Sequence, residues 1–392
     1  MTAITAYSPF ARDVQENPYP FYAWLRQEHP VYYNAPFDFW ALSRYDDVVQ
    51  AARNHEVFSS AQGVGPVKRY GLSMITNDPP IHTRLRRLVN RAFTPHMMAR
   101  FEARIQAIID ALLDTVLDKG AFDLVADYAI PLPVTVIAEI LGVEPERRED
   151  FKRWSDEVVL FVGGAEHESD RERYRHSWEE FKAYCIHIMA ARRQQPQEDI
   201  ISLLVQAEAE HDALTEMEIL NFCQLLLVAG NETTTNLIAN GALAFATFPE
   251  EWQKLCAQPC LAPMVVEEVL RYDSPVQATF RTTTRAVELH GITIPADSKV
   301  ALLWASANHD AAVFPAPERF DITRTPNQHV AFASGIHYCL GASLARLEAR
   351  LTTETFVRRL RHLRPDPDSS AARVYNPLLR GLTSYPMLFT PA

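Results

Sequence analysis

The sequence predicts a mainly α-helical protein that carries small antiparallel β-sheets. Apolar residues recur at helical spacing through most of the 392 residues, whereas stretches that alternate like strands are few and short. No internal repeat, low-complexity tract or linker divides the chain. We therefore expect one domain over residues 1–392, with β-rich parts near residues 30–45, 285–305 and 370–390 and helices in the remainder.

Composition and charge argue against several classes of protein. Hydrophobic residues make up 47% of the chain, which is ample for a buried core. The net charge of −11 argues against nucleic-acid binding and against a basic membrane-surface protein. Met1–Asp13 lacks the pattern of a secretion signal, and no apolar run of about 18 residues occurs, so we expect no membrane anchor. Five scattered cysteines fit a reducing, cytoplasmic location.

Short local patterns predict the ordinary elements. A helix over Phe21–Glu28 is followed by a hairpin of two strands, Val31–Asn34 and Phe39–Ser43. Residues Phe58–Thr76 are irregular and contain three glycines, which predicts a long loop. Further helices are predicted over Asp46–Asn54, Met98–Lys119, Val134–Leu141, Glu149–Val162, Glu168–Arg193, Ile200–Ala209 and Ala262–Tyr272, and short strands over Val287–Ile294 and Lys299–Leu303.

A long apolar stretch in the middle of the chain predicts a buried helix. Thr215 and Glu218 have the spacing of a capping box at its start, and residues 219–229 are apolar on nearly every face. The polar run 231–235 allows two interpretations, namely two successive helices or one helix with a polar interruption above a ligand. One helix over Thr215–Ala246 would span roughly 48 Å, enough to cross the molecule.

A segment rich in arginine begins after the helix-starting sequence Asp78-Pro79-Pro80. His82 and Arg86 are four residues apart in it, so they share one face of the expected helix. This face is either a solvated basic surface or an anchor for a ligand that carries carboxylates.

Residues 332–341 are the most informative stretch of the chain. Gly335 and Gly341 flank Cys339, and a strongly helical run follows from Ala342. Glycine permits close approach of the backbone to a flat ligand, and the free N–H groups of a helix start lower the pKa of a nearby thiol. Cys339 is therefore either a small buried hydrophobe or a thiolate ligand for a soft or borderline metal.

This stretch resembles the haem-binding loop of the cytochrome P450 family, through Phe332, Gly335, His337, Cys339 and Gly341. The resemblance implies haem b as the cofactor, with the Cys339 thiolate as the ligand of its iron. The sequence departs from the family pattern at Ala333, where a second glycine is frequent, and this departure puts the local geometry of the loop in question.

Two more motifs resemble those of the same family. Residues 229–233 are similar to its oxygen-activation motif, which implies Ala229 and Gly230 beside the cofactor, Glu232 in proton supply and Thr233 in hydrogen bonding to the oxygen. Threonine can also bond back to the carbonyl four residues earlier, here that of Ala229.

Glu268 and Arg271 lie three residues apart on a predicted helix, as in the Glu-x-x-Arg motif of the family. The segment Pro317–Phe320 is similar to the one that supplies a third member, here Arg319. The resemblance implies that these three residues form a structural network on the thiolate side of the cofactor.

The resemblance extends from about Asn17 to the end of the chain and implies the rest of the site. The haem propionates would be held by His82, Arg86, Arg281 and His337. The substrate cavity would be lined by Val276, Gln277, Thr279, Phe280, Leu382 and Thr383, the last two on a predicted turn over residues 380–383.

The implied activity is that of a soluble, bacterial-type haem-thiolate monooxygenase whose long central helix crosses a buried haem. It would insert one oxygen atom of O2 into a hydrophobic molecule of the terpenoid, steroid, fatty acid or polyketide type. Because the chain lacks a dinucleotide-binding glycine pattern and a Cys-rich iron–sulfur pattern, electrons would come from a separate ferredoxin or flavodoxin and its NAD(P)H reductase. The arginine-rich segment, with Arg346 and Arg350, would offer such an acidic partner a basic docking face.

Two alternatives stay open. One is a peroxygenase driven by peroxide, although peroxide carries its own protons and does not require the pair Glu232 and Thr233. The other is a haem sensor or carrier without turnover, which has no need of an acid and a threonine on the oxygen side.

Overall fold

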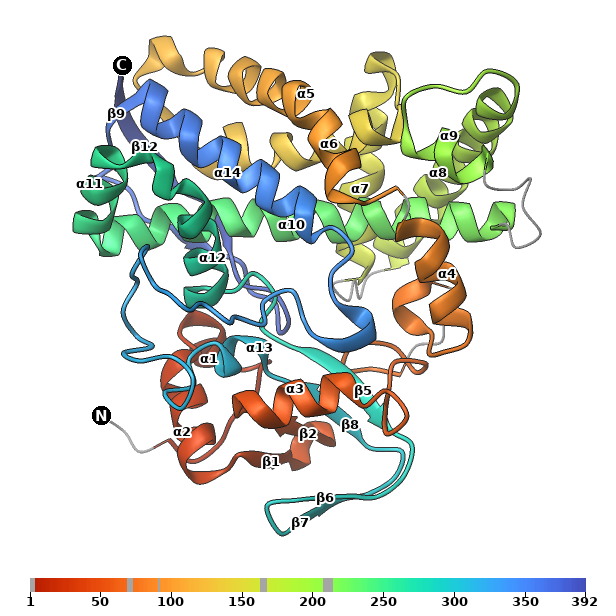
Figure 1. Cartoon of the computed structure of the whole chain (residues 1–392), viewed down its shortest axis with the longest axis vertical. Helices are drawn as coiled ribbons and strands as arrows, with labels where there is room; N and C mark the ends of the chain where they lie inside the picture. The colour runs from red at the N-terminus through yellow and green to blue at the C-terminus, as the bar shows by residue number, and fades with distance from the viewer. Residues whose placement is uncertain (1–3, 69–72, 91, 163–167, 207–213) are drawn as a thin grey trace.

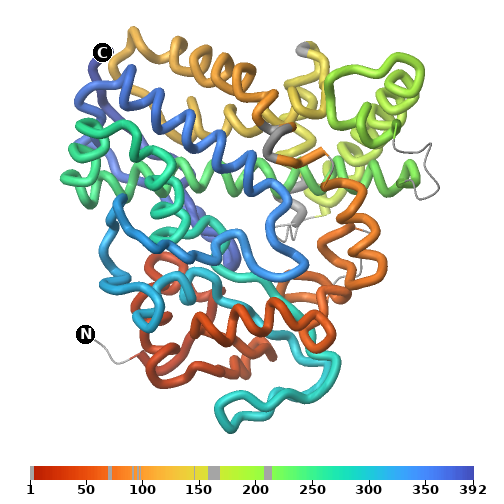
Figure 2. Tube along the Cα trace, in the orientation of Figure 1, coloured from red at the N-terminus to blue at the C-terminus, as the bar shows by residue number. Residues whose placement is uncertain are grey.

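The computed structural model describes residues 4–68, 73–90, 92–162, 168–206 and 214–392. It confirms the predicted fold class, because helices dominate and the sheets are small (Figure 1). Residues 4–60 and residues 275–305 meet in one part of the molecule, while most of the remaining helices form the other part (Figure 2). The chain therefore returns late in the sequence to elements that it formed early.

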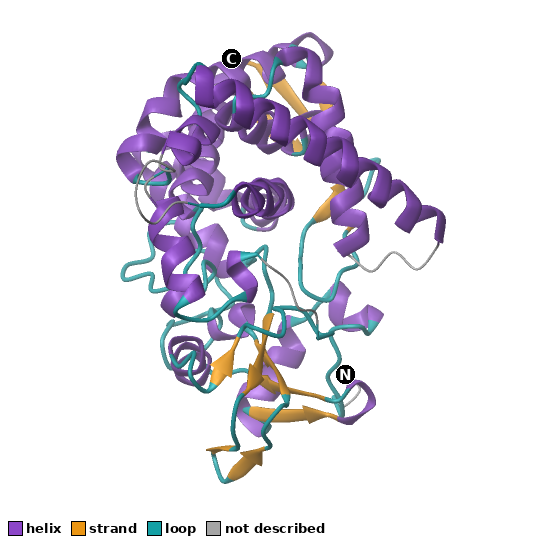
Figure 3. Ribbon diagram, turned by 90° about the vertical axis from the view of Figure 1, so that its right-hand side faces the viewer, coloured by secondary structure: helices purple, strands orange, loops and turns teal. Residues whose placement is uncertain are grey.

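The helical part is built around α10 (Glu216–Thr247), which runs through the molecule and is seen end-on among other helices in Figure 3. It packs against α6, α12 and α14, and its apolar side chains join those of α6 and α14 in one large core and those of α12 in another. The helices are α1 (Arg12–Glu16), α2 (Tyr19–Glu28), α3 (Tyr45–Arg53), α4 (Ile81–Asn90), α5 (Pro95–Asp114), α6 (Pro131–Leu141), α7 (Arg148–Val162), α8 (Glu168–Gln194), α9 (Ile200–Gln206), α11 (Pro249–Ala257), α12 (Ala262–Tyr272), α13 (Trp304–Ala307) and α14 (Ala342–Arg359).

The largest sheet has the order β1-β2-β8-β5-β3, and all its neighbours are antiparallel except the parallel pair β2 and β8. This sheet joins the start of the chain to its last third. A second sheet, β4-β12-β9, ties the C-terminal strand to the helical part. The strands are β1 (Val31–Asn34), β2 (Phe39–Leu42), β3 (Phe58–Ser59), β4 (Ala121–Asp123), β5 (Thr279–Thr283), β6 (Val287–Leu289), β7 (Ile292–Ile294), β8 (Lys299–Leu302), β9 (Leu360–Pro365), β10 (Ala372–Arg373), β11 (Leu382–Ser384) and β12 (Pro386–Pro391).

The central stretch forms one helix of 32 residues rather than two. Its start has the predicted capping box, in which Thr215 accepts from the backbone of Glu218 and the Glu218 carboxylate accepts from the backbone of Thr215. The polar run does not end the helix because neighbouring elements satisfy it. Asn231 donates to Ser155 Oγ at 2.7 Å, and Thr235 donates to the carbonyl of Ala129 at 2.8 Å.

The predicted helices are present with shifted ends. Residues 207–209 of the helix predicted from Ile200, and part of the long loop predicted over 58–76, lie outside the described residues. The predicted turn at 380–383 is wrong, because Leu382 begins strand β11. Arg380 is held there by an ion pair with Asp273 at 2.7 Å, and Gly381 lies so close to α10 that any side chain at its position would meet Asn236.

One stretch among the described residues, Leu124–Leu141, is long and apolar enough to cross a membrane. It comprises the single π-helical segment η4 (Leu124–Ala129) and α6, and 67% of it is buried inside the fold. A core helix of this kind satisfies the same criterion, so this stretch is explained by its packing against α10.

Glu348 on α14 is a carboxyl group inside the core. The residue is 1% exposed, and its Oε2 atom has no hydrogen-bond partner in the described part of the chain. Burial raises the pKa of Glu348 to about 8. The folded protein therefore keeps this group protonated at pH values at which an unfolded chain has lost the proton.

The free energy of unfolding should decrease as the pH rises, because of Glu348. Its folded pKa of about 8 lies above the unfolded value of about 4.3, so its contribution is complete below about pH 4 and is lost as the pH rises through 8. We expect Glu348→Gln to stabilise the protein by on the order of 3 kcal/mol more at pH 8 than at pH 5. Urea unfolding at both pH values measures this difference. Glu354→Gln, at a half-exposed site on the same helix, is the control, and equal pH profiles for the two variants would contradict the prediction.

Candidate active site

Cys339 lies in a short loop that leads directly into α14. The loop contains the 3-10 turn η8 (Gly335–His337), and Gly341 is the N-cap residue of the helix. The backbone N–H of Cys339 donates to the carbonyl of Phe332 at 2.9 Å, which closes the loop on itself. Cys339 packs against a core cluster that contains Phe332 and residues of α10 and α12.

The two glycines of this loop, Gly335 and Gly341, are explained by different constraints. Gly335 has φ +74, and a Cβ there would lie 2.5 Å from the carbonyl oxygen of Ala52 on α3, so the close contact with α3 requires glycine. Gly341 has φ −83, and a Cβ there would meet no atom within 4 Å. Packing alone therefore does not explain Gly341, whereas a flat group beside Cys339 does.

Ala333, the departure from the family pattern, occupies the left-handed region at φ +61. A residue with a Cβ is disfavoured there by about 1 kcal/mol, which is why glycine is frequent at this position. The loop nevertheless closes, because Ala333 donates its N–H to the carbonyl of Val330 at 2.9 Å. Its side chain packs on the apolar cluster formed by α3 and the largest sheet, called the sheet cluster below.

The surroundings of the Cys339 thiol act in opposite directions. Burial raises its pKa, while a hydrogen bond from the backbone N–H of Gly341 and the charges of Arg86 and Arg346 lower it. The donor and the two cations would all favour the thiolate once an additional positive charge, such as a metal ion, is bound to the sulfur.

Four basic side chains gather beside this loop. The rings of His82 and His337 lie 4.4 Å apart, centroid to centroid. Both ring nitrogens of His82, and Nε2 of His337, are buried without a hydrogen-bond partner in the described residues. Within the same residues, Arg281 has one acceptor, the carbonyl of Phe280 at 2.8 Å, and Arg86 has no ion pair.

This cluster of donors is poorly accommodated by the protein alone. Burial, followed by the charge of Arg281, lowers the pKa of His337 to about 2. Burial likewise lowers the pKa of Arg281 to about 10 and the pKa of His82 and Arg86. Buried polar groups in folded proteins nearly always have partners. The cluster thus has the character of a site for a bound anion.

The oxygen-side motif lies in the middle of α10. Thr233 donates from Oγ1 to the carbonyl of Ala229 at 2.7 Å, which confirms the predicted back-bond. Ala229 is exposed, so this face of α10 is open. Gly230 instead faces α6, because a Cβ there would lie 2.9 Å from Ile137 Cδ1. The prediction that Gly230 makes room for the cofactor is therefore not supported by its position; it makes room for α6.

Glu232 is partly buried on the side of α10 that faces α7. Burial, followed by the charge of Asp156, raises the pKa of Glu232 above its ordinary value. The group therefore retains a proton closer to neutral pH than an exposed carboxylate does.

Glu268 and Arg271 form a buried ion pair with two contacts, Nη2 to Oε1 at 2.8 Å and Nε to Oε2 at 2.9 Å. The predicted third member is wrong. Arg324 donates from Nε to Glu268 Oε1 at 3.2 Å, whereas Arg319 is exposed and contributes its backbone carbonyl to Arg271. Sequence spacing missed Arg324 because the turn after Phe320 brings the later arginine back to the helix.

Several residues predicted to line the substrate cavity point elsewhere. Gln277 is buried and bonded, accepting from Tyr22 at 3.0 Å and donating to the carbonyl of Ser274 at 2.7 Å. Phe280 packs edge-on against Phe39 in the N-terminal core, and Leu382 belongs to the helical core. These three side chains thus point into the protein core around the site.

The other three lining candidates, Val276, Thr279 and Thr383, stay predictions, although each makes a contact within the fold. Thr279 accepts from Trp304 Nε1 at 3.0 Å, and Val276 packs on the sheet cluster. Thr383 is exposed on β11 and makes a hydrogen bond to the carbonyl of Ala372 at 3.4 Å.

Comparison with known proteins agrees with this site. The chain matches cytochrome P450 over residues 7–259 and 257–383. It is 39% identical over 373 residues to a steroid C26-monooxygenase of Mycobacterium tuberculosis, which covers 95% of this chain and 93% of that protein. The structure of CYP109Q5 from Chondromyces apiculatus has a TM-score of 0.90 at 40% identity, with 98% of each chain covered. CYP109E1 from Bacillus megaterium, in complex with testosterone, has a TM-score of 0.89 at 37% identity, with 95% of this chain and 99% of that chain covered.

The chain belongs to the cytochrome P450 family, whose members are oxidoreductases that bind haem b through a cysteine thiolate. The residues present fit this cofactor. The open space at Gly341 leaves room for a flat ring beside the Cys339 sulfur, and the unpartnered ring nitrogens of His82 and His337, with the guanidinium of Arg281, suit its two carboxylates.

Arg324 and Arg319 allow a direct test of the network. Arg324→Gln should destabilise the protein by about 1–3 kcal/mol, because it removes a charged hydrogen bond from the buried Glu268 carboxylate. Arg319→Gln should change the stability by less than about 0.5 kcal/mol, because its side chain is exposed. Denaturant unfolding of both variants checks this order, and a larger loss in Arg319→Gln would reverse the assignment.

Proposed function

We propose that this protein is a monooxygenase that inserts one oxygen atom of O2 into a hydrophobic molecule of steroid size, with Cys339 as the ligand of the haem iron. The proposal for the substrate class rests on the steroid C26-monooxygenase of Mycobacterium tuberculosis and on the testosterone complex of CYP109E1. Terpenoids, fatty acids and polyketides share the same apolar character and are the other candidates.

One observation carries the proposal most strongly. Both ring nitrogens of His82 and Nε2 of His337 are buried without hydrogen-bond partners in the described residues, at the loop that carries Cys339 and leads into α14. His82 and Arg86 come from α4, Arg281 from β5 and His337 from the cysteine loop, so three separate segments converge on one anion site. We assign these four side chains to the haem propionates.

Bound haem supplies a redox-active iron for the activation of O2. The residues of the chain then have to deliver protons to the oxygen side of the cofactor and not to the thiolate side. Thr233 commits its hydroxyl proton to the carbonyl of Ala229, so its oxygen is free to accept a hydrogen bond from the open face of α10. Glu232, with its raised pKa, holds a proton on the α7 side and can release it toward Thr233.

We further propose that the electrons come from a separate ferredoxin or flavodoxin and its NAD(P)H reductase in the cytoplasm. The basic face expected for docking is weaker than its sequence suggests. Arg84 pairs with Glu218, Arg346 with Glu267 and Arg350 with Glu102, while Arg86 turns inward toward Cys339. Arg91 lies outside the described residues. Docking therefore relies less on charge than the count of arginines implies.

The ligand assignment predicts a spectrum. The reduced protein with carbon monoxide should give a Soret band far to the red of histidine-ligated haem, and Cys339→Ser should lose this band. Cys260→Ser, which removes an exposed thiol, is the control and should keep it. A histidine-type band in the unaltered protein would refute the assignment. Product formation with a reductase system, with peroxide alone or with neither then separates the monooxygenase, the peroxygenase and the sensor.

Thr233→Ala should uncouple the reaction. Without the hydroxyl, protons are no longer delivered to the oxygen in the productive way. NAD(P)H is therefore still consumed, but hydrogen peroxide is released and the amount of product per NAD(P)H falls several-fold. Thr233→Ser retains the hydroxyl and should keep most of the coupling. Parallel assays of peroxide and product measure this ratio, and full coupling in the alanine variant would remove Thr233 from the mechanism.

A further inference from the structure

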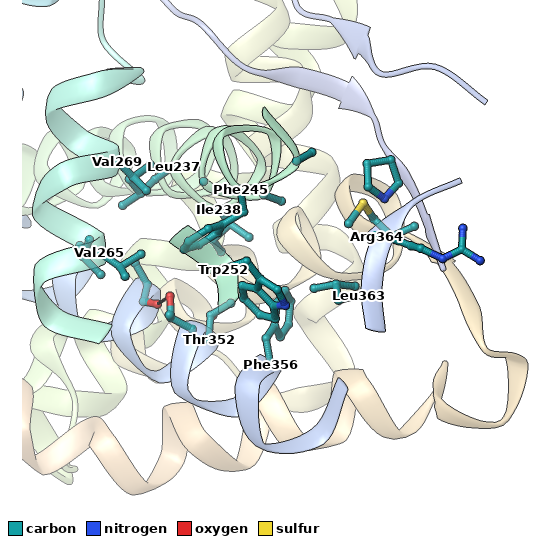
Figure 4. A pocket seen from close by; sticks show the side chains of 18 of the residues that line it. Leu237, Ile238, Phe245, Trp252, Val265, Val269, Thr352, Phe356, Leu363 and Arg364 are labelled. Atoms are coloured by element: carbon teal, nitrogen blue, oxygen red, sulfur yellow. Dashed lines mark hydrogen bonds between the residues drawn. The ribbon is translucent and has the colours of Figure 1, made fainter. Parts of the chain in front are cut away.

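A cavity borders the core cluster on which Cys339 packs, because Leu237, Val265 and Val269 belong to both. It has a volume of about 280 Å3 and is enclosed by α10, α11, α12, α14 and strand β9 (Figure 4). None of the residues assigned above to the haem or to the oxygen side lines it. On α14 it begins at Ala349, seven residues after the helix starts, which places it roughly 10 Å along that helix.

The cavity wall is almost entirely apolar. Leu237, Ile238 and Phe245 come from α10, Val265 and Val269 from α12, and Phe356 from α14. The two hydroxyl groups in the wall are already bonded inside the protein. Thr352 shares a hydrogen bond with Tyr128 at 2.9 Å, and Thr353 donates to the carbonyl of Ala349 at 2.7 Å. The wall thus offers an entering molecule contacts with hydrocarbon.

The rim differs from the wall by carrying a cation. Arg364 on β9 is one of the residues at the edge of the cavity, and its exposed side chain extends outward, away from the apolar side chains of the wall (Figure 4). No ion pair or hydrogen bond of its guanidinium group occurs within the described residues. Neighbouring Arg358 and Arg359 are different, because Asp110 and Asp114 neutralise them.

The size of the cavity limits the ligand. An apolar cavity of about 150 Å3 in a protein core binds benzene. A volume of about 280 Å3 is nearly twice as large and accommodates an unbranched chain of about ten carbons. An apolar wall with one cation at its rim is complementary to a hydrocarbon chain that ends in a carboxylate.

We propose that this cavity is a second ligand site, separate from the active site, that takes a free medium-chain fatty acid. The hydrocarbon chain lies between α10, α12 and α14, and the carboxylate meets Arg364 at the rim. The site is independent of which substrate the haem side oxidises.

Trp252 provides a local probe, because its side chain lines the cavity and packs edge-on against Phe245 at 5.2 Å between ring centroids. Titration of the haem-loaded protein with 10-bromodecanoic acid should quench tryptophan fluorescence in a saturable way, since bromine quenches by contact. Trp252→Phe should remove the saturable part. Quenching that persists in this variant would place the ligand elsewhere and overturn the proposal.

Two arms separate this site from the active site and test the charge. The quenching should persist when an azole occupies the haem iron, and its loss would mean that the acid binds in the active site. Arg364→Gln should weaken the binding of the acid about two- to fivefold, as expected for an exposed ion pair, without changing the binding of 10-bromodecanol. Arg361→Gln, an exposed arginine of the same strand outside the cavity, is the matched control.

A third variant tests the cavity itself. Ala242 lines it from α10 and is only partly buried, so Ala242→Phe fills the space with little disturbance of the core. This variant should keep its haem spectrum and lose the quenching. Unchanged quenching in Ala242→Phe, or equal binding of the acid and the alcohol by the unaltered protein, would overturn the proposal.

Discussion

The position of the cysteine loop depends on the buried ion pair of Glu268 and Arg271. Both side chains are almost fully excluded from solvent, so neither charge is tolerable without the other. Arg271 also donates to the carbonyls of Asn308, Pro317 and Arg319, and Glu268 accepts from the backbone of Asp321. These bonds tie the irregular segment 308–321, which forms neither a long helix nor a strand, to α12. The chain then continues from this segment to the loop that carries Cys339.

α10 provides the opposite boundary of the site. Its polar residues would weaken an isolated helix, but the buried Asn231, Thr235 and Asn240 each bond to a neighbouring element. Asn240 donates to the carbonyls of Asp273 and Arg380 at 2.9 and 3.0 Å, which connects α10 to the segment before β5 and to the segment before β11. The same helix thus presents an open face at Ala229, buried bonds elsewhere, and the wall of a second cavity farther along. It contributes both to the proposed haem site and to the wall of the cavity.

Much of the site is visible in local sequence spacing. The cysteine loop, the capping box at Thr215 and the back-bond of Thr233 each depend on residues at most ten positions apart, so the chain specifies them before it folds. The gathering of His82, Arg281 and His337 is different. Their spacing says nothing about proximity, and only the family resemblance brought them together in advance.

The sequence by itself determined the fold class, the single long helix as one of two options, and the residue types of the haem site. The tertiary structure decided that Arg324 reaches Glu268, that Gly230 faces Ile137, and that Gln277 and Phe280 point into the protein core. It also decided that most surface arginines are already paired. The physical reason is the same in each case. The direction of a side chain is settled by which distant segment packs against it, and that information is absent from the local pattern.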